Sequence, residues 1–430
     1  MDKNRKNQNG RLSLSICLRL SLCLLGSIFM IILFYMLTAL EEPNMELSAH
    51  SLAATPKDWP HPFIHIVNTR FMQHQTDLID LAKARIVLFE TFCLGSMLGQ
   101  SLLQGFDTPP MLWIIKTDPD LDDSLLKNLI SLLKPYSFIY LVASNVNYGI
   151  GINPGGWRGG EAGEDVLQSR VYTGNMTLFR QAHAARESHG VLETRLDADD
   201  GLHVRYLEMI QEEALSKLQY TSNESRHDKL QWMYWCAMNH LAWNPTPLFA
   251  TGNQFEEHGS FIPLRSSNRC ITAGITLGIS VGQNESSIPR FMHHDLFYAL
   301  RIDKKRATCH GDECLHMIQK PLLGAIRSRT TASAGMRGVI TEKGEYAEKM
   351  GKFAVPLASQ HLIAALEKGF NVSMSNTVRA NRYMQEHVSA IAADNLRGQC
   401  THGHSCKNST RQALEELLRA AEMNMNSSGQ

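Results

Sequence analysis

Three aspartates lie within four residues of the stretch Thr194–Leu202, which reads TRLDADDGL. Asp197 and Asp199 form an Asp-x-Asp pair, and Asp200 follows directly. Carboxylate oxygens suit Mg²⁺ or Mn²⁺, and a bound ion would attract a phosphate-bearing ligand. Three carboxylates this close repel one another unless a cation or basic groups offset their charge. The pattern indicates a divalent-metal site, and its alternative is a solvated acidic turn in which Asp200 caps the next helix.

Gly201 excludes two other acidic motifs. An EF-hand loop that began at Asp197 would carry glycine at its sixth position, whereas Gly201 is the fifth residue. A phosphatase that forms an aspartyl phosphate would have a hydroxyl residue after Asp-x-Asp-x, and this chain has Gly201 there. The meaning of the acidic stretch therefore depends on the elements that position it.

The acidic stretch follows the last of four apolar runs that alternate with helical patterns. The predicted strands cover 63–67, 111–115, 138–142 and the approach to Asp197 through Val191 and Leu192, and the predicted helices cover 76–104, 121–133, 164–188 and 203–218. This alternation predicts an α/β fold with a mostly parallel, Rossmann-like sheet flanked by helices. The carboxylates then lie at the carboxyl edge of the sheet, where open α/β folds bind ligands.

Two further patterns have a functional and a structural interpretation. Residues 149–163 hold seven glycines but fit neither a P-loop nor the dinucleotide fingerprint, so they indicate a surface loop over the site or an insertion without a role. The run Phe291–Asp295 offers two histidines, and His294 is a candidate to complete the metal shell begun by Asp199. A structural histidine pair is the alternative.

An uncharged apolar run at 20–40 is long enough to cross a bilayer as a helix. Five Lys and Arg residues precede it, and Glu41 and Glu42 follow it, which favours a cytosolic N-terminus. We therefore expect a single-pass type II membrane protein; a cleavable signal peptide is the rival interpretation. The expected parts are a cytosolic tail at 1–19, a signal anchor at 20–40, a stem at 41–61, a luminal domain at 62–340 and a helical C-terminal extension at 341–430.

The cysteines suit an oxidising lumen. Seven of the nine follow the apolar run, and close spacing favours the disulfides Cys309–Cys314 and Cys400–Cys406. Zinc binding between Cys400 and Cys406, which flank two histidines, is the alternative. Six Asn-x-Ser/Thr acceptors are compatible with the same compartment. Lys plus Arg and Asp plus Glu number 42 each, so no net charge favours nucleic acid as a partner.

The chain resembles the rhamnosyltransferase-like family, a group similar to glycosyltransferases of the GT-A type. The likeness covers about residues 62–340, and the block ending TRLDADDGLH is its most specific part. Ala273 stands where the family pattern leads us to expect proline. The blocks that carry the likeness are Asn68–Phe71, Leu112–Pro119, Thr194–His203, Cys270–Thr276 and Thr331–Met336.

The resemblance implies a Mn²⁺- or Mg²⁺-dependent transfer of a sugar from a nucleotide-sugar donor to a glycan or other acceptor, on the luminal side of the Golgi membrane. It implies that Asp199 binds the metal and that Asp197 contacts the metal and the donor's ribose or sugar. Asp118 would contact the nucleobase or ribose, with Arg70 nearby. Arg327, Arg329 or Arg337 could stabilise the departing nucleoside diphosphate, although each also suits a solvated surface.

The catalytic base stays open at this point. Asp200 is our first candidate, and Glu256, Glu257 and Asp295 have a suitable chemical type. Two other classes of function remain as alternatives: a luminal carbohydrate-binding or scaffold protein on a transferase fold, and a metal-dependent hydrolase.

Overall fold

The computed structural model describes residues 59–147, 156–221, 229–245, 253–255, 257–266, 269–290, 293–302, 314–319, 323–333, 352–354 and 359–401. The chain divides into two compact units, Met1–Pro56 and Lys57–Gln430, and all described residues belong to the second. The predicted signal anchor at 20–40 and most of the predicted stem lie outside the described residues. None of the helices in the described part combines the length and apolar character that a bilayer crossing requires.

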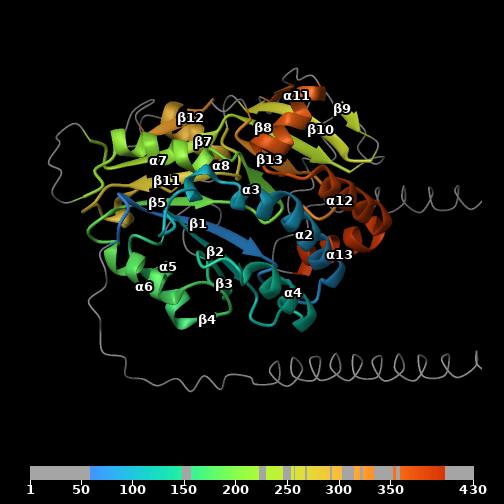
Figure 1. The fold of residues 1–430 in the computed structure, drawn as a ribbon, viewed down its shortest axis with the longest axis horizontal. Helices are drawn as coiled ribbons and strands as arrows, with labels where there is room; N and C mark the ends of the chain where they lie inside the picture. Colours follow the sequence, from blue (N-terminus) through green and yellow to red (C-terminus); the bar gives the residue numbers. More distant parts are fainter. Residues whose placement is uncertain are drawn as a thin grey trace, which may run out of the picture. The chain divides into compact units, whose positions relative to one another are not determined.

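The larger sheet has eight strands within the described residues, in the order β12-β7-β11-β5-β1-β2-β3-β4 (Figure 1). Four adjacent strands of this sheet run parallel to one another. This confirms the predicted mixed α/β fold with a mostly parallel sheet. These strands are β5 (Gly190–Arg195), β1 (Phe63–Phe71), β2 (Leu112–Thr117) and β3 (Ile139–Ala143).

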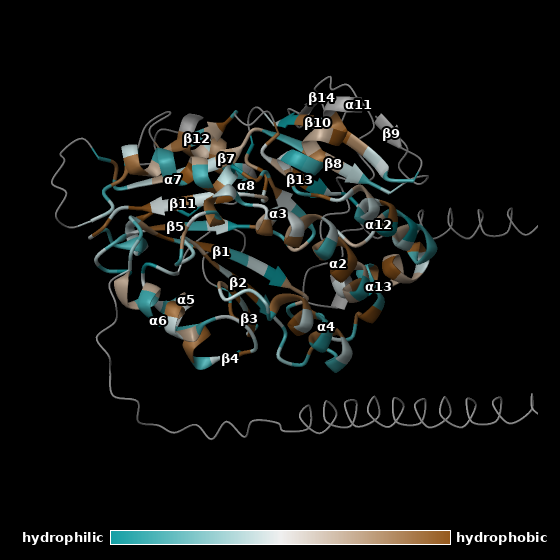
Figure 2. Cartoon of the chain, in the orientation of Figure 1, coloured by the Kyte–Doolittle hydropathy of each residue, from teal (hydrophilic) through white to brown (hydrophobic). Residues whose placement is uncertain are grey.

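Helices cover both faces of these parallel strands, and alternate side chains along each strand pack against them. Val67 and Trp113 pack with α2 (Ile79–Leu88) and α4 (Asp123–Leu133) in one core. Ile66 and Ile114 pack with α5 (Glu161–Gln168) and α6 (Met176–Ala185) in another. In Figure 2, β1 changes from hydrophobic at its start to hydrophilic toward its carboxyl end. The carboxyl end of β1 therefore brings polar side chains to this edge of the sheet.

Two predicted helices are interrupted. The segment predicted as one helix over 76–104 contains α2, the π-helical turn η1 (Phe89–Leu94), α3 (Gly95–Leu98) and the short η2 (Ser101–Leu103). The segment predicted as a helix over 164–188 is divided by the two-residue strand β4 (Arg170–Val171). Gly174 follows β4 with φ of 96°, where a side chain would also meet the ring of Tyr140, so the chain turns there before α6 begins.

Beyond β5, the sheet continues through an antiparallel strand. β11 (Ile275–Ile279) pairs antiparallel with both β5 and β7 (Trp232–Ala237), and β12 (Leu315–Ile318) pairs parallel with β7. A disulfide between Cys236 and Cys270 joins this region, and the sequence analysis did not predict that pair. Cys314 is also disulfide-bonded.

A smaller sheet has the order β14-β10-β8-β13-β6, with β9 (Asn253–Phe255) paired to β10. The chain passes from β5 of the larger sheet directly into β6 of the smaller one through the acidic stretch. This connection places the acidic stretch where the two sheets meet. The strands of the smaller sheet are β14 (Lys352–Ala354), β10 (Gly259–Ser266), β8 (Asn239–Asn244), β13 (Ala325–Ser328) and β6 (Asp200–Leu202).

The C-terminal segment contains α11 (Ser359–Ala364), α12 (Met374–Glu386) and α13 (Val388–Thr401), together with β14. Leu362, Phe370, Met384 and Ile391 belong to the same core as α2 and β1. The C-terminal helices are therefore integrated with the body of the fold, and α12 and α13 lie beside α2 (Figure 1).

Candidate functional site

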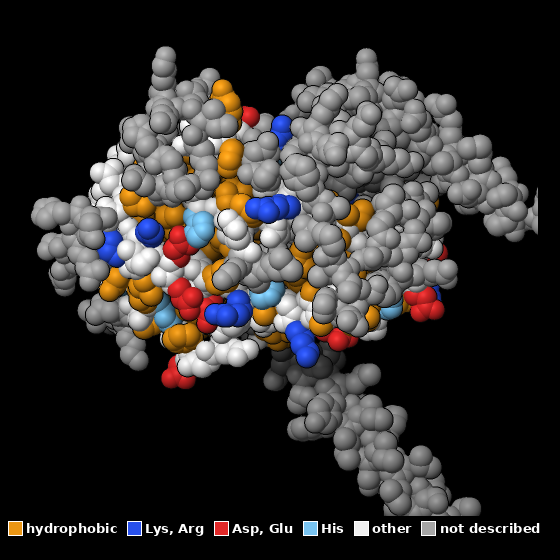
Figure 3. Space-filling view, turned by 90° about the horizontal axis from the view of Figure 1, so that it is seen from above, with side chains coloured by type: hydrophobic (Ala, Val, Ile, Leu, Met, Phe, Trp, Pro, Cys, Tyr) orange, Lys and Arg blue, Asp and Glu red, His pale blue; other side chains and the backbone are white. Residues whose placement is uncertain are grey.

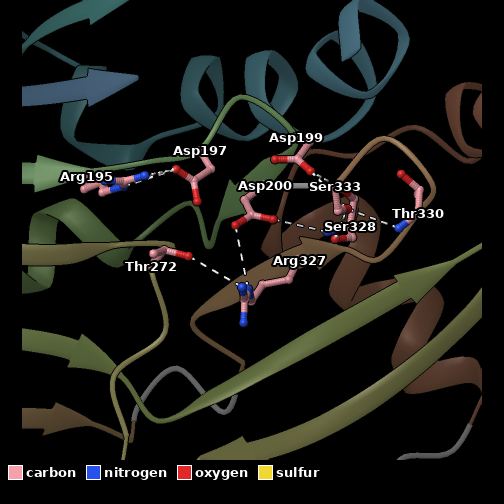
Figure 4. Close-up of polar contacts among 9 residues, drawn as sticks. All are labelled: Arg195, Asp197, Asp199, Asp200, Thr272, Arg327, Ser328, Thr330 and Ser333. Carbon is pink, nitrogen blue, oxygen red and sulfur yellow. Dashed lines mark hydrogen bonds and ion pairs between the residues drawn. The ribbon is translucent and has the colours of Figure 1, made fainter. Parts of the chain in front are cut away.

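The acidic turn alternates anchored apolar residues with more accessible carboxylates. Leu196 and Ala198 are buried, at 0% and 5% exposure, whereas Asp197 and Asp199 are partly exposed. The N–H of Leu196 donates to the carbonyl of Asn68 at 3.0 Å and fixes the turn to β1. The two carboxylates of the Asp-x-Asp pair are thus held at the carboxyl edge of the parallel strands, as predicted (Figure 4).

Asp197 is oriented by the residue that ends β5. The Arg195 guanidinium donates to Asp197 Oδ1 from Nε at 3.1 Å and from Nη2 at 2.8 Å. Burial opposes the ionisation of Asp197, but the charge and hydrogen bonds of Arg195 outweigh it and lower the pKa of this carboxyl to about 2. Asp197 is therefore ionised at neutral pH.

Asp199 is held by hydroxyl groups. Ser328 Oγ donates to Asp199 Oδ2 at 2.8 Å, and Ser333 Oγ lies 3.4 Å from the same oxygen. Burial and the nearby charge of Asp197 raise the pKa of Asp199 above its ordinary value. A bound cation would remove this penalty, because it favours the ionised form of both acids.

Asp200 faces inward, with only 3% of its surface exposed. Its Oδ1 accepts from the N–H of Ser328 at 3.2 Å, and its Oδ2 lies 3.8 Å from Arg327 Nε. Burial and the charge of Asp199 raise the pKa of Asp200 well above its ordinary value. Asp200 belongs to β6, and the next helix, α7 (Tyr206–Lys217), begins after Arg205, so Asp200 does not cap it.

Gly201 brings the acidic turn against the π-helical turn η1. A side chain at this position would begin 2.7 Å from the carbonyl oxygen of Phe92 and 3.0 Å from Ser96 Oγ. The Ser96 hydroxyl also accepts from the N–H of Leu202 at 3.1 Å. The glycine that excluded the EF-hand and phosphatase motifs is therefore required by close packing in this fold.

Arg70 reaches the same site from β1. Its side chain is exposed, and it interacts electrostatically with both Arg195 and Asp197. Partial desolvation and the charge of Arg195 lower the pKa of Arg70 to about 10, against the attraction of Asp197, so the guanidinium stays charged at neutral pH. The structure thus brings together Arg70 and the Asp-x-Asp pair that the sequence analysis assigned to one site.

Asp118 lies at the same edge of the sheet but is occupied by protein donors. Its Oδ2 accepts from the N–H of His74 and from Asn145 Nδ2, each at 2.8 Å. Its Oδ1 accepts from the N–H of Asp120 at 2.9 Å. With 4% exposure, Asp118 joins the turns that follow β1, β2 and β3.

The remaining candidates are less well placed or lie outside the described part. His294 falls in α8 (His293–Phe297), but its side chain is not among those described. Glu256 and Arg337 are likewise outside the described residues, and the side chains of Glu257 and Asp295 are exposed. Of these five candidates, three therefore lie outside the described side chains and two have exposed side chains.

Several site residues were missed from the sequence. Arg85 of α2 donates to the carbonyl of Ala332 at 3.3 Å and interacts electrostatically with Asp197 and Asp199. It carried no signal, because an arginine on an amphipathic helix usually faces solvent. Thr272 also hydrogen-bonds Asp197. The blocks around Thr272 and Ser333 did carry a signal, since they were two of those that resembled a known family.

A buried hydrogen-bond chain supports the turn from below. Gln211 Nε2 lies 3.2 Å from His65 Nδ1, His65 Nε2 lies 2.8 Å from Thr194 Oγ1, and Thr194 Oγ1 lies 2.7 Å from Thr276 Oγ1. Thr276 donates to the carbonyl of Gly274 at 3.1 Å. That carbonyl can only accept a hydrogen bond, so Thr276 accepts from Thr194 and Thr194 accepts from His65. His65 therefore carries its proton on Nε2. Burial lowers the pKa of His65 to about 3.

The donor set suits a hard divalent cation that is shared with a phosphate ligand. Among the described residues, no group of three or more His, Cys, Asp or Glu side chains is arranged to hold a metal ion. Mg²⁺ commonly binds through one or two carboxylates plus substrate phosphates, and Asp197 and Asp199 supply two such carboxylates. The Ser328 and Ser333 hydroxyls both face Oδ2 of Asp199, so neither serine contacts Oδ1.

No protein-family model matches the sequence, and a search of curated proteins gives no significant match.

Proposed function

We propose that the protein is a metal-dependent glycosyltransferase of the GT-A type, which transfers a sugar from a nucleotide-sugar donor to a glycan or other acceptor. One observation carries the proposal: a partly exposed Asp197–Asp199 pair stands at the carboxyl edge of a parallel sheet, within a cluster of arginines. The antiparallel strand β11 beside β5 and the second sheet that begins at the acidic turn support the GT-A assignment.

The charges around the turn favour an anionic ligand. Three aspartates interact electrostatically with five arginines, which leaves an excess of two positive charges when all are ionised. A nucleoside diphosphate attached to a sugar carries two negative charges, and a divalent ion on the aspartates would strengthen its binding. The five arginines are Arg70, Arg85, Arg195, Arg327 and Arg329.

Each residue near the turn then has a role. Asp197 and Asp199 hold Mn²⁺ or Mg²⁺, which would stabilise the charge on the departing diphosphate. Arg195 keeps Asp197 ionised, and Arg70 approaches the donor from β1. We assign Asp200 a positioning role in place of the predicted role as catalytic base, because its carboxylate is buried and held by Ser328.

Asp118 contributes to the donor pocket through the backbone that it holds. Its carboxylate is already occupied by three protein donors, so we propose that it shapes the turn around His74. That turn contains two non-glycine residues with positive φ, Met72 at 54° and His74 at 58°. The bond to Asp118 stabilises this unusual backbone at the edge where the nucleotide would bind.

The proposed compartment is the Golgi lumen, with residues 20–40 as the membrane anchor. The disulfide between Cys236 and Cys270 supports an oxidising environment, where such bonds form and persist. On the face shown in Figure 3, acidic and basic side chains are interspersed, which suits a soluble domain exposed to the lumen.

The test uses the full-length chain with a panel of nucleotide sugars, in Mn²⁺ and in chelator. We expect binding and transfer for one donor class in Mn²⁺ only, and at least a 100-fold loss of nucleotide affinity in Asp199→Ala. The matched control is Asp120→Ala, which removes an exposed carboxylate at the same edge of the sheet. Unchanged nucleotide binding in Asp199→Ala would contradict the proposal, and donor turnover that needs no acceptor would instead favour a hydrolase.

A further inference from the structure

The loop that holds Asp199 keeps its shape through its own hydrogen bonds. This segment, Ser328–Ser333, is called the serine loop below. Ser333 Oγ donates to the carbonyl of Ser328 at 3.1 Å and accepts from the N–H of Thr330 at 3.1 Å (Figure 4). The N–H of Ser333 donates to the carbonyl of Thr330 at 3.1 Å. Both hydroxyls that contact Asp199 belong to this loop, so its conformation determines where that carboxylate lies.

Three successive carbonyls of the serine loop are bonded to distant parts of the chain. Asn395 Nδ2, on α13, donates to the carbonyl of Thr331 at 2.6 Å and to that of Ser333 at 3.1 Å. Arg85, on α2, donates to the carbonyl of Ala332. Asn395 is 1% exposed and the loop residues 331 and 332 are at most 2% exposed. Buried carbonyls require such partners, so α13 and α2 together hold the loop.

The residue before Asn395 connects α13 to α2. Asp394 Oδ2 accepts from the N–H of Asp80 at 2.9 Å and from that of Leu81 at 3.2 Å. These N–H groups open α2, whose N-cap residue Leu78 supplies no side-chain bond. A carboxylate at this position stabilises the helix start. Neighbouring residues of α13 therefore hold the helix that carries Arg85 and the loop that carries the serines.

We propose that α13 is a clamp on the Asp199 site, with Asn395 as its positioning residue. Residues after 341 show no catalytic motif, but through Asn395 they determine the position of the serines that hold Asp199. The clamp is made by the hydrogen bonds from α13 to the serine loop, and only its effect on metal binding rests on the proposed function. Asn395 acts on Asp199 through the serine loop, whose carbonyls it binds.

The test compares Asn395→Leu with Asn381→Leu in the full-length chain. Asn381, on α12, is also buried at 3% exposure, but its Nδ2 donates to the carbonyl of Glu257, away from the serine loop. Amide hydrogen exchange is measured across residues 328–333, together with the melting temperature and the affinity for Mn²⁺ alone. We expect exchange in the serine loop to rise at least about tenfold in Asn395→Leu and to stay unchanged in Asn381→Leu.

The two variants separate a local clamp from general stability. Both should lower the melting temperature, but only Asn395→Leu should weaken Mn²⁺ binding, by about tenfold. Equal exchange of the serine loop in the two variants, or unchanged exchange in Asn395→Leu, would overturn the clamp. If the wild-type chain does not bind Mn²⁺, the proposed function fails while the exchange result still decides the clamp. Asn395→Ser, a smaller change, serves the same comparison if Asn395→Leu does not fold.

Discussion

The turns after β2 and β5 both place aspartates at the carboxyl edge of the main sheet, yet the protein uses them differently. Asp118, after β2, is buried and accepts from two backbone N–H groups and one amide. Asp199, after β5, is partly exposed and accepts from Ser328 Oγ on one oxygen, which Ser333 Oγ also approaches at 3.4 Å. Position at a binding edge is therefore not sufficient to make a carboxylate available to a ligand.

The type of donor explains the difference. A backbone N–H is fixed in direction, and that of His74 has besides Asp118 only the longer contact with Asn145 Oδ1 at 3.3 Å, so loss of the carboxylate costs stability. A serine hydroxyl can rotate toward another acceptor, and the raised pKa of Asp199 shows that burial and Asp197 already disfavour its charge. Asp118 is suited to hold the fold, and Asp199 is suited to gain a cation.

The largest expected effect on stability is that of Asp118→Ala. This change removes the acceptor of the Asp120 N–H and of the Asn145 amide and leaves the His74 N–H only its 3.3 Å contact with Asn145 Oδ1, so we expect the free energy of unfolding to fall by about 3 kcal/mol. Asp120→Ala, at an exposed position of the same turn, should change it by less than about 0.5 kcal/mol. Denaturant unfolding measures both, and equal effects would remove the distinction between the two turns.

Gly201→Ala tests whether the turn after β5 depends on close packing. The added methyl would lie 2.7 Å from a backbone carbonyl of η1, so either the π-helical turn or the acidic turn must move. We expect a loss of about 2 kcal/mol, within the range for overpacked sites, together with weaker Mn²⁺ binding. A Gly201→Ala variant as stable as the wild type would show that η1 can move at little cost, and that close packing does not require glycine at this position.

The hydrogen-bond chain below the turn predicts a pH dependence. Unfolded histidine has a pKa near 6.5, and burial lowers the pKa of His65 to about 3. Between these values the unfolded chain binds more protons, so His65 makes stability fall as pH falls from about 6.5 toward 3, by up to about 1.4 kcal/mol per pH unit.

His65→Gln should reduce the loss of stability per pH unit by the contribution of His65, which is up to about 1.4 kcal/mol. Gln keeps a donor toward Thr194 but does not titrate in this range. Urea unfolding at pH 6.5 and 5.5 measures the two slopes. Identical slopes in the two proteins would exclude a contribution from His65.

The smallest effect on stability is expected for Asp199→Asn. This change should stabilise the protein, whereas Asp118→Ala and Gly201→Ala should destabilise it. Removing a charge that burial and Asp197 disfavour should raise the free energy of unfolding at pH 7 by about 0.5 kcal/mol in the absence of metal. Added Mn²⁺ should stabilise the wild type and not the variant. A clear loss of stability in Asp199→Asn without metal would mean that Asp199, like Asp118, primarily holds the fold.

The sequence by itself determined the parallel core and the position of the acidic pair. The strands β1, β2, β3 and β5 follow from local apolar runs, and parallel strands must end at a common edge. Asp197 and Asp199 could therefore be placed at that edge without any long-range contact, whereas Arg70 was assigned to the same site through the family resemblance. The glycine at 201 was also informative, because it excluded two other acidic motifs before the structure showed what packs against it.

Only the tertiary structure decided which acids remain accessible and which residues hold them. Asp118, Asp199 and Asp200 have the same chemical type, and their roles diverge because donors from distant segments compete for their oxygens. Arg85, Ser328 and Asn395 reach one site from separate elements, and Cys236 pairs with Cys270 across 34 residues. Such pairings depend on how elements pack in three dimensions, and no local periodicity or spacing in the sequence encodes them.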